Sequence, residues 1–453
     1  MPSIRVLLGA FGDPGHAFPM IALGRALAAR GHDVTLQTWE RWRAPVEAEG
    51  LTFTPAPEYS AFPIGEQPLD FYEAVVYTTR DTLPLVRDLR PDVVVHDILT
   101  LGPSLAGELA GVPRATLIPH VFPEAAPGFP IYSFGARLPR TAAGRAFWER
   151  AHLPVRRGLE SGRLALNRTR AAVGLPPLSH PHGGTSRDLA LVATFPQLEY
   201  PRVWPSHVHV VGPLMWEPPA EDVELPGGRV STGVAGYGSA NGDRSEDDDP
   251  ADWPLVLVAP STSQDPDHRL LHAALRGLAD APVRVLATWN RRLPSRPLSV
   301  PDNAKVVDWL SYARTMPHCD VVVCHAGHGT LVRALASGCP VVACPIAGDM
   351  NENAARVAWA GAGVRLPRRF ISPRPIRHAV ERALGEPSIR ARARDFGAWA
   401  STHDAGARAS ALIELLATSS MSRSGIPTGP DAHPIPIPFG DPGPARRAGR
   451  RGY

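Results

Sequence analysis

The segment from residue 321 to residue 353 constrains the possible folds of this chain most strongly. It starts with Val-Val-Val-Cys at 321–324 and continues with His-Ala-Gly-His-Gly-Thr at 325–330. A buried strand that breaks at glycines and enters a helix presents backbone N–H groups and a positive helix end, which together can hold a phosphate. A second apolar stretch at 339–344 leads into a polar loop at 349–353. We therefore expect anion binding at the carboxyl edge of a parallel sheet.

Two series of apolar strands alternate with helical segments on either side of one polar stretch. Strands are expected at 4–11, 34–38, 92–97, 114–118, 189–194 and 208–211, and then at 255–260, 283–287, 305–307, 321–324 and 339–344. Helical patterns such as those at 19–30 and 142–173 imply right-handed crossovers and parallel sheets. A long helical pattern also covers 388–416.

The chain is too long for one average hydrophobic core, with 453 residues. The expected fold class is α/β, with two Rossmann-like domains whose parallel sheets face each other across a cleft. Residues 217–254 are rich in Gly, Ser, Asp and Pro, and such a segment cannot bury enough apolar surface to become ordered. The expected parts are an N-terminal domain at 1–216, a linker at 217–254, a C-terminal domain at 255–395, a helix at 396–417 that packs back on the N-terminal domain, and a disordered tail at 418–453.

Composition excludes several classes of protein. The net charge of +3 is small and arginines are spread along the chain, so nucleic acid is not an expected partner. The four cysteines, at 319, 324, 339 and 344, lie beside apolar strands and are expected to be buried thiols. Neither a secretory signal nor an apolar run of about 20 residues is present, which predicts a cytoplasmic protein without an integral membrane span.

The motifs resemble the donor site of family 1 glycosyltransferases with the GT-B fold, which include plant natural-product and bacterial macrolide and polyketide enzymes. The matching residues are His-x-Gly-x-Gly-Thr at 325–330, Gly-Cys-Pro at 338–340, and the segment from Pro345 to Ala354. The resemblance extends from about residue 3 to residue 417. It implies a glycosyltransferase that uses a nucleotide-diphosphate sugar as co-substrate and needs no other cofactor.

The resemblance also assigns donor-binding residues. Those implied to hold the diphosphate are His325, Gly327, Gly329 and Thr330, with Asn353 assisting and with hydroxyls from Ser261 and Thr262. Trp309 lies 16 residues before His325, where the family usually has an aromatic ring that stacks on the nucleotide base.

Two positions depart from the family pattern. Met350 stands where members often have a Gln that binds sugar hydroxyls. Two alternatives stay open: the donor is a less hydroxylated sugar, or its sugar contacts fall on Asp349 and Asn351. Arg333 stands where plant members have a Glu that binds ribose. The donor therefore stays open between a UDP-sugar and a dTDP-linked deoxysugar.

His16 is the candidate catalytic base. Inverting transfer requires the acceptor hydroxyl to lose its proton as it attacks the anomeric carbon, and imidazole suits that task near neutral pH. His16 follows the first strand within Pro-Gly-His-Ala-Phe-Pro, which resembles the Gly-His-x-x-Pro of the family. Asp97 ends a strand and is the candidate carboxylate that orients His16. His96 points to the opposite face of that strand, so Asp97 is preferred.

The acceptor is expected to be an apolar, hydroxylated small molecule bound in the N-terminal domain, near His16, Asp97 and aromatic segments such as 129–134 and 147–148. The acidic run at 246–249 superficially matches the Asp-x-Asp metal signature of the other major glycosyltransferase fold, but its place in the linker predicts a solvated loop and no metal site. The oligomeric state stays open.

Three other functions remain as alternatives. They are an inactive nucleotide-sugar binder or auxiliary protein, an epimerase of the same fold, and an N-acetylglucosaminyl transferase. A dinucleotide oxidoreductase is disfavoured because no Gly-x-Gly-x-x-Gly follows a strand.

Overall fold

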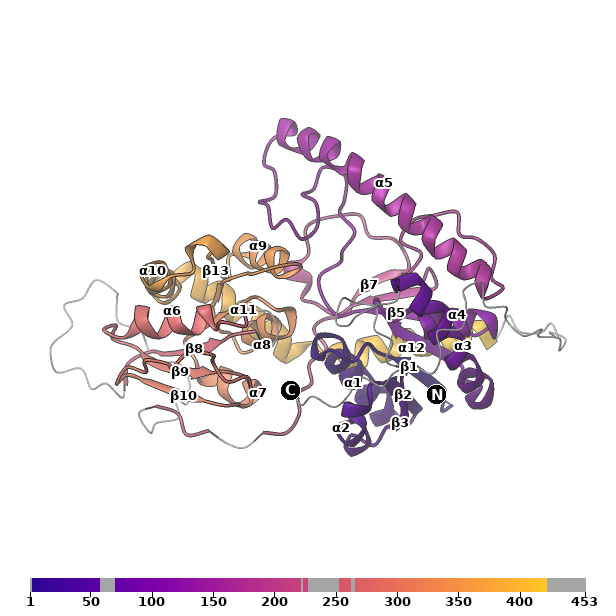
Figure 1. Ribbon diagram of the computed structural model, residues 1–453, viewed down its shortest axis with the longest axis horizontal. Coiled ribbons are helices and arrows are strands. Elements are labelled where there is room, and N and C mark those ends of the chain that lie inside the picture. The colour runs from indigo at the N-terminus through magenta and orange to yellow at the C-terminus, as the bar shows by residue number, and fades with distance from the viewer. Residues whose placement is uncertain (1, 58–69, 221–222, 227–251, 262–264, 422–453) are drawn as a thin grey trace.

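The computed structural model describes residues 2–57, 70–220, 223–226, 252–261 and 265–421. Within them the chain forms two parallel sheets with helices packed on both sides (Figure 1). Most of the expected linker and tail, the acidic run at 246–249 and Thr262 lie outside the described residues.

The first sheet contains seven parallel strands in the order β3-β2-β1-β4-β5-β6-β7. They are β1 (Arg5–Gly9), β2 (Asp33–Thr38), β3 (Thr52–Pro55), β4 (Val93–Asp97), β5 (Arg114–Ile118), β6 (Leu189–Val192) and β7 (Val208–Val210). Every residue of β4 is buried because helices cover both faces of the sheet. The strand order reverses between β1 and β4, and α/β sheets bind ligands beyond the carboxyl ends of strands at such a point.

Helices and 3-10 turns connect these strands. They are α1 (Pro14–Ala29), η1 (Glu40–Trp42), α2 (Arg43–Ala48), α3 (Phe71–Leu89), α4 (Leu101–Leu109), α5 (Ala142–Ala172) and η2 (Pro196–Leu198).

The second sheet contains six parallel strands in the order β10-β9-β8-β11-β12-β13. They are β8 (Leu255–Ala259), β9 (Arg284–Thr288), β10 (Ala304–Val307), β11 (Val321–Cys324), β12 (Val341–Ala343) and β13 (Gly363–Arg365). The accompanying helices are α6 (Arg269–Leu278), α7 (Tyr312–Thr315), η4 (Met316–His318), α8 (His328–Ala336), α9 (Met350–Ala360), η5 (Arg368–Phe370), α10 (Pro373–Gly385) and α11 (Pro387–Thr402).

The last helix, α12 (Ala405–Met421), returns to the first sheet and packs against α1. Its Glu414 carboxylate accepts hydrogen bonds from Arg30 Nε at 2.6 Å and from His32 Nε2 at 2.8 Å. Helix α12 is therefore fixed to the segment between the end of α1 and the start of β2.

Two helices differ from the sequence prediction. Helix α1 begins at Pro14 and not at residue 19, because a proline is tolerated in the first turn, where its missing N–H has no helical partner. The single helix predicted over 388–416 is divided between α11 and α12. Asp404 lies at the division and accepts a hydrogen bond from the N–H of Ala407 at 2.9 Å, so it caps the new helix.

All four cysteines are free and buried, as predicted. Among the described residues, no helix combines the length and apolar character needed to cross a membrane.

Candidate active site

His16 and Asp97 meet at the carboxyl edge of the first sheet, where β1 and β4 are neighbours. Asp97 is the last residue of β4, and His16 lies in the first turn of α1. His16 Nδ1 is 3.1 Å from Asp97 Oδ1. The side chain of Asp97 is 0% exposed, whereas that of His16 is 15% exposed. The structure therefore brings the two predicted catalytic residues into contact and leaves the imidazole accessible.

Three further donors surround the Asp97 carboxylate. The N–H of Leu99 and the hydroxyl of Thr100 each donate to it at 2.7 Å, and the N–H of Phe11 donates as well. Burial on its own raises the pKa of Asp97, but the charge and hydrogen bond of His16, together with the bonds from Phe11 and Thr100, lower it overall. Asp97 therefore stays ionised and accepts the Nδ1 proton of His16, which leaves Nε2 free to act as a base.

The pKa of His16 is raised above its ordinary value of 6.5. Burial lowers this pKa, but the combined charge and hydrogen bond of Asp97, with smaller effects from Asp13 and Asp349, outweigh it. Asp349 precedes α9 in the second unit. Asp349 is one of the predicted donor-binding residues, so its charge couples that part of the second unit to the predicted base.

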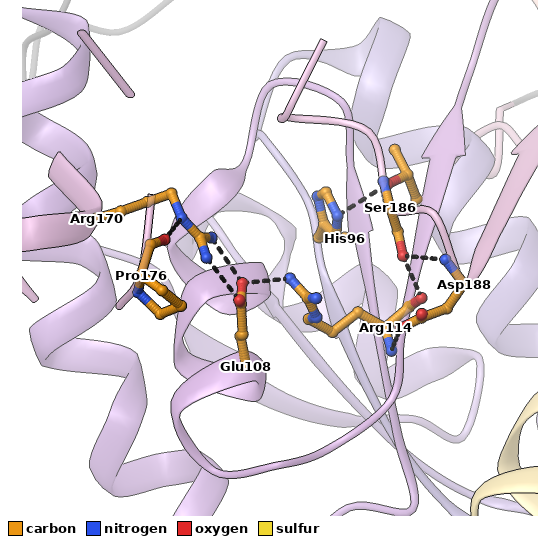
Figure 2. A network of polar contacts seen from close by, with 8 residues as sticks. His96, Glu108, Arg114, Arg170, Pro176, Ser186 and Asp188 are labelled. Carbon is orange, nitrogen blue, oxygen red and sulfur yellow. Dashed lines mark hydrogen bonds and ion pairs between the residues drawn. The ribbon is translucent and has the colours of Figure 1, made fainter. Parts of the chain in front are cut away.

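His96 belongs to a separate polar network (Figure 2). As neighbours in β4, His96 and Asp97 point to opposite faces of the strand. The Nδ1 of His96 donates to the Asp97 carbonyl at 3.0 Å, and its Nε2 accepts from the Thr116 hydroxyl at 2.9 Å. The N–H of Ser186 donates to Thr116 Oγ1 at 2.7 Å. Because a carbonyl oxygen only accepts, a neutral His96 ring carries its proton on Nδ1, and its Nε2 accepts. Burial lowers the pKa of His96 to about 4, so the ring is neutral. His96 therefore supports the strand end and does not replace Asp97.

The sequence analysis did not predict two polar residues near the pair formed by His16 and Asp97, which we call the dyad. One is Thr100, described above. The other is His120, two residues beyond β5, whose Nδ1 lies 2.8 Å from the Val121 carbonyl oxygen and 3.4 Å from the Tyr132 hydroxyl. Burial lowers the pKa of His120, and the charges of Asp349 and His16 also act on it. Its position just past a central parallel strand is the signal that could have found it.

The turn between β11 and α8 has its left-handed residue at Ala326, with φ of 60°, and not at a glycine. Gly327 has φ of −57° and precedes the first residue of α8. A Cβ built on Gly327 or Gly329 would meet no protein atom within 4 Å. The two glycines therefore leave open space above the helix N-terminus, where a phosphate could approach the backbone N–H groups. Thr330 lies in the same first turn.

His325 is buried, and both of its ring nitrogens contact protein atoms. Nδ1 is 2.9 Å from the Cys344 carbonyl oxygen, and Nε2 is 3.1 Å from Asp265 Oδ2. Asp265 also accepts the N–H groups of Arg269 and Leu270 at the start of α6. Its pKa falls to about 2, because the bonds from His325 and these N–H groups outweigh the effect of burial. A direct bond from His325 to a phosphate, as the resemblance implies, would require one of these side chains to move. Sequence reasoning gave no signal for Asp265.

Asn353 supports the turn between β11 and α8, which we call the donor turn. Its side-chain amide donates to the Ala326 carbonyl at 3.0 Å and reaches Asp349 Oδ2 at 3.4 Å. Asn353 is buried, whereas Asp349 and Met350 are half-buried at the start of α9. The arrangement makes Asn353 a support for the turn and leaves Asp349 and Met350 on its accessible side.

The predicted base-stacking residue, Trp309, is half-buried after β10. The guanidinium of Arg291 lies 4.7 Å from the centre of its ring. Arg333 Nε is 3.6 Å from a carboxylate oxygen of Glu217. Ser261 is half-buried two residues after β8, at the same sheet edge as the donor turn.

A buried ionic cluster ties the two units together next to the site. Arg356 in α9 contacts Glu199 at 2.6 Å and Glu352 at 2.9 Å. Glu199 also accepts the N–H of Phe122 at 2.7 Å. The helix that follows Asp349 is thereby joined to the segment that carries His120.

Known proteins resemble this chain along most of its length. Residues 273–406 match the family model described as erythromycin biosynthesis protein CIII-like, C-terminal domain. The 4'-demethylrebeccamycin synthase of Lentzea aerocolonigenes is 30% identical over 444 residues, which cover 91% of this chain and 99% of that protein.

Solved structures share the fold. The glycosyltransferase of kitacinnamycin has a TM-score of 0.68 at 22% identity, covering 92% of this chain and 100% of its own. The glycosyltransferase VinC in complex with dTDP has a TM-score of 0.63 at 18% identity, covering 92% and 100%.

Proposed function

We propose that this chain, which belongs to the family 1 glycosyltransferases with the GT-B fold, is an inverting, metal-independent enzyme. It moves a sugar from a UDP- or dTDP-sugar to a hydroxyl of an apolar small molecule. The observation that carries this proposal is the His16–Asp97 contact at the carboxyl edge of the first sheet, with Asp349 of the donor loop within electrostatic reach of His16.

In the proposed reaction, His16 Nε2 takes the proton of the acceptor hydroxyl as its oxygen attacks the anomeric carbon. The bond from that carbon to the nucleoside diphosphate breaks, and the diphosphate leaves with the bonding electrons. Asp97 stabilises the imidazolium that forms. The open N-terminus of α8 offers N–H groups to the leaving diphosphate, which is why no metal is required.

For the donor, a dTDP-sugar is the first choice. Met350 cannot donate a hydrogen bond to a sugar hydroxyl, and Arg333 is turned to Glu217 where plant relatives have a ribose-binding carboxylate. VinC, a structural neighbour, has been solved with dTDP.

A screen of UDP-, dTDP- and GDP-sugars by thermal shift identifies the donor, because a ligand that binds the folded state raises Tm. Incubation of that donor with phenolic and polyketide acceptors, followed by NMR of the product, then tests the reaction. We expect the anomeric configuration to be inverted. Retention of configuration, or consumption of donor without any acceptor, would overturn the proposal.

A further inference from the structure

Helix α5 runs along the outside of the molecule, and much of it projects beyond the sheet of its unit (Figure 1). Its buried residues are confined to the C-terminal end: Leu166, Thr169 and Arg170. That end is firmly held, because the Arg170 guanidinium makes two hydrogen bonds of 2.7 Å to Glu108 (Figure 2). From residue 142 to residue 165 no side chain is buried. Most of α5 therefore forms an outer helical surface that contributes little to the hydrophobic core of the protein.

Large apolar side chains are concentrated on this exposed surface. Ten such side chains are exposed in the described part of the chain, and four of them fall between residues 134 and 164. Phe134 and Phe147 are each 63% exposed, and Leu153 and Leu164 are 54% and 49% exposed. Both phenylalanines contact the ring of Trp148, at centroid distances of 6.4 and 5.3 Å. Clustered exposure of this kind marks an interaction surface, in contrast to single exposed residues.

The same surface is strongly basic. Residues 137–168 include eight arginines and two glutamates, and one of these glutamates, Glu160, is paired with Arg163. Arg150, Leu153, Arg157, Leu164 and Arg168 follow each other at helical spacings and are all exposed, so they form one stripe. Within the described residues, Arg150, Arg157 and Arg168 have no acidic side chain within 4 Å.

We propose that the outer surface of α5, together with Phe134, docks on an anionic lipid surface. Arginines attract acidic headgroups, and leucine and phenylalanine side chains between them enter the boundary with the acyl chains. A second copy of the chain fits less well, because two such stripes would bring like charges together. The phosphate backbone of a nucleic acid would match the arginines but would leave the apolar side chains without a partner.

This surface adjoins the donor side of the site. The carbonyl of Gly135, next to Phe134, accepts a hydrogen bond from Arg365 at the end of β13. A Cβ on Gly135 would lie 2.4 Å from the Asn351 carbonyl oxygen, so this segment rests directly on α9. Docking here would bring this side of the candidate site close to the lipid, where an apolar acceptor dissolves. That last step depends on the proposed function, whereas the docking itself does not.

Vesicle flotation with the full-length protein tests the proposal without any sugar donor. We expect binding to phosphatidylcholine vesicles that contain phosphatidylglycerol, no binding to phosphatidylcholine alone, and weaker binding in high salt. Each arginine near such a surface changes the partition coefficient about fivefold, so Arg150→Gln with Arg157→Gln should lower it about 25-fold. Phe134→Ser with Phe147→Ser should lower it as well.

Leu293→Ser is the matched control, because Leu293 is 77% exposed but lies in the second unit. It should bind vesicles like the wild type. Vesicle binding by the wild type does not test the proposal on its own, because acidic lipid also attracts the arginines at 446, 447, 450 and 451. The comparison of the α5 variants with the wild type is therefore the decisive measurement. The proposal is overturned if the anionic vesicles are not bound, or if the α5 variants bind them unchanged. It is equally overturned if the variants instead abolish a dimer seen by light scattering, or if duplex DNA competes fully with the vesicles.

Discussion

Replacing Asp97 by Asn tests the dyad while keeping the size of the side chain. The carboxylate accepts from His16 and Leu99 on one oxygen and from Phe11 and Thr100 on the other. An amide has only one acceptor oxygen, so its NH2 group would face the N–H of either Leu99 or Phe11. One buried backbone donor loses its partner in either orientation, which costs about 1–3 kcal/mol of folding free energy.

The effect on catalysis should exceed the effect on stability. Without the carboxylate, His16 is no longer held with Nδ1 protonated, and the imidazolium formed in the reaction has no counter-charge. A positioned general base contributes about 10²–10⁴ in rate, so we expect kcat to fall about 10³-fold. The pKa of His16 should also fall, because Asp97 is the group that raises it most. The acid limb of the rate profile should therefore move to lower pH.

The assay is steady-state sugar transfer as a function of pH, with urea unfolding of the same variant to confirm that it is folded. Thr100→Val serves as the control, because it removes one hydroxyl and keeps the carboxylate charge. It should lower kcat by about tenfold or less. Wild-type kcat with an unmoved acid limb in Asp97→Asn would refute the assignment of the dyad.

Four further predictions concern the same structure. For the wild type, the acid limb of kcat/KM should lie above pH 6.5, because the pKa of His16 is raised; a limb below that value in the rate profile would contradict this reading. Ala326→Gly should stabilise the protein by about 1 kcal/mol in urea unfolding, because it relieves a left-handed residue; a loss of stability would speak against strain there. Arg356→Ala should destabilise by about 3–5 kcal/mol, since it leaves Glu199 and Glu352 buried without their partner; an unchanged Tm would show that the cluster is dispensable. Bonds from Arg30 lower the pKa of Glu414 to about 2, so its contribution to stability is present above the unfolded value of 4.5 and is lost as pH falls below it; Glu414→Gln should show a weaker loss of stability in acid, and an identical acid profile would contradict the pairing.

The sequence was sufficient to predict features that depend on local pattern. The apolar run ending at Asp97 and the glycine break after Cys324 both indicate strand ends, and parallel strands bring such ends to one edge. The contact between His16 and Asp97 follows from this, and His16 itself lies in the first turn of α1.

The sequence was insufficient where a residue acts through tertiary contacts. Asp265 lies 60 positions from His325, and nothing local indicates that its carboxylate meets that ring. The left-handed residue of the donor turn is Ala326, although the neighbouring glycines are better suited to that conformation. Glycines suit such a turn both for tight turning and for unobstructed approach of a ligand, and in the structure Gly327 and Gly329 provide the open space while Ala326 takes the left-handed conformation.

The central claim is that His16 supplies the chemistry while the second unit holds the donor. It is tested most directly by measuring the donor Kd and the kcat of His16→Ala side by side. We predict that kcat falls about 10²–10⁴-fold, as expected for loss of a general base, while the donor Kd stays within about twofold of the wild type. Undiminished turnover in His16→Ala would contradict the account.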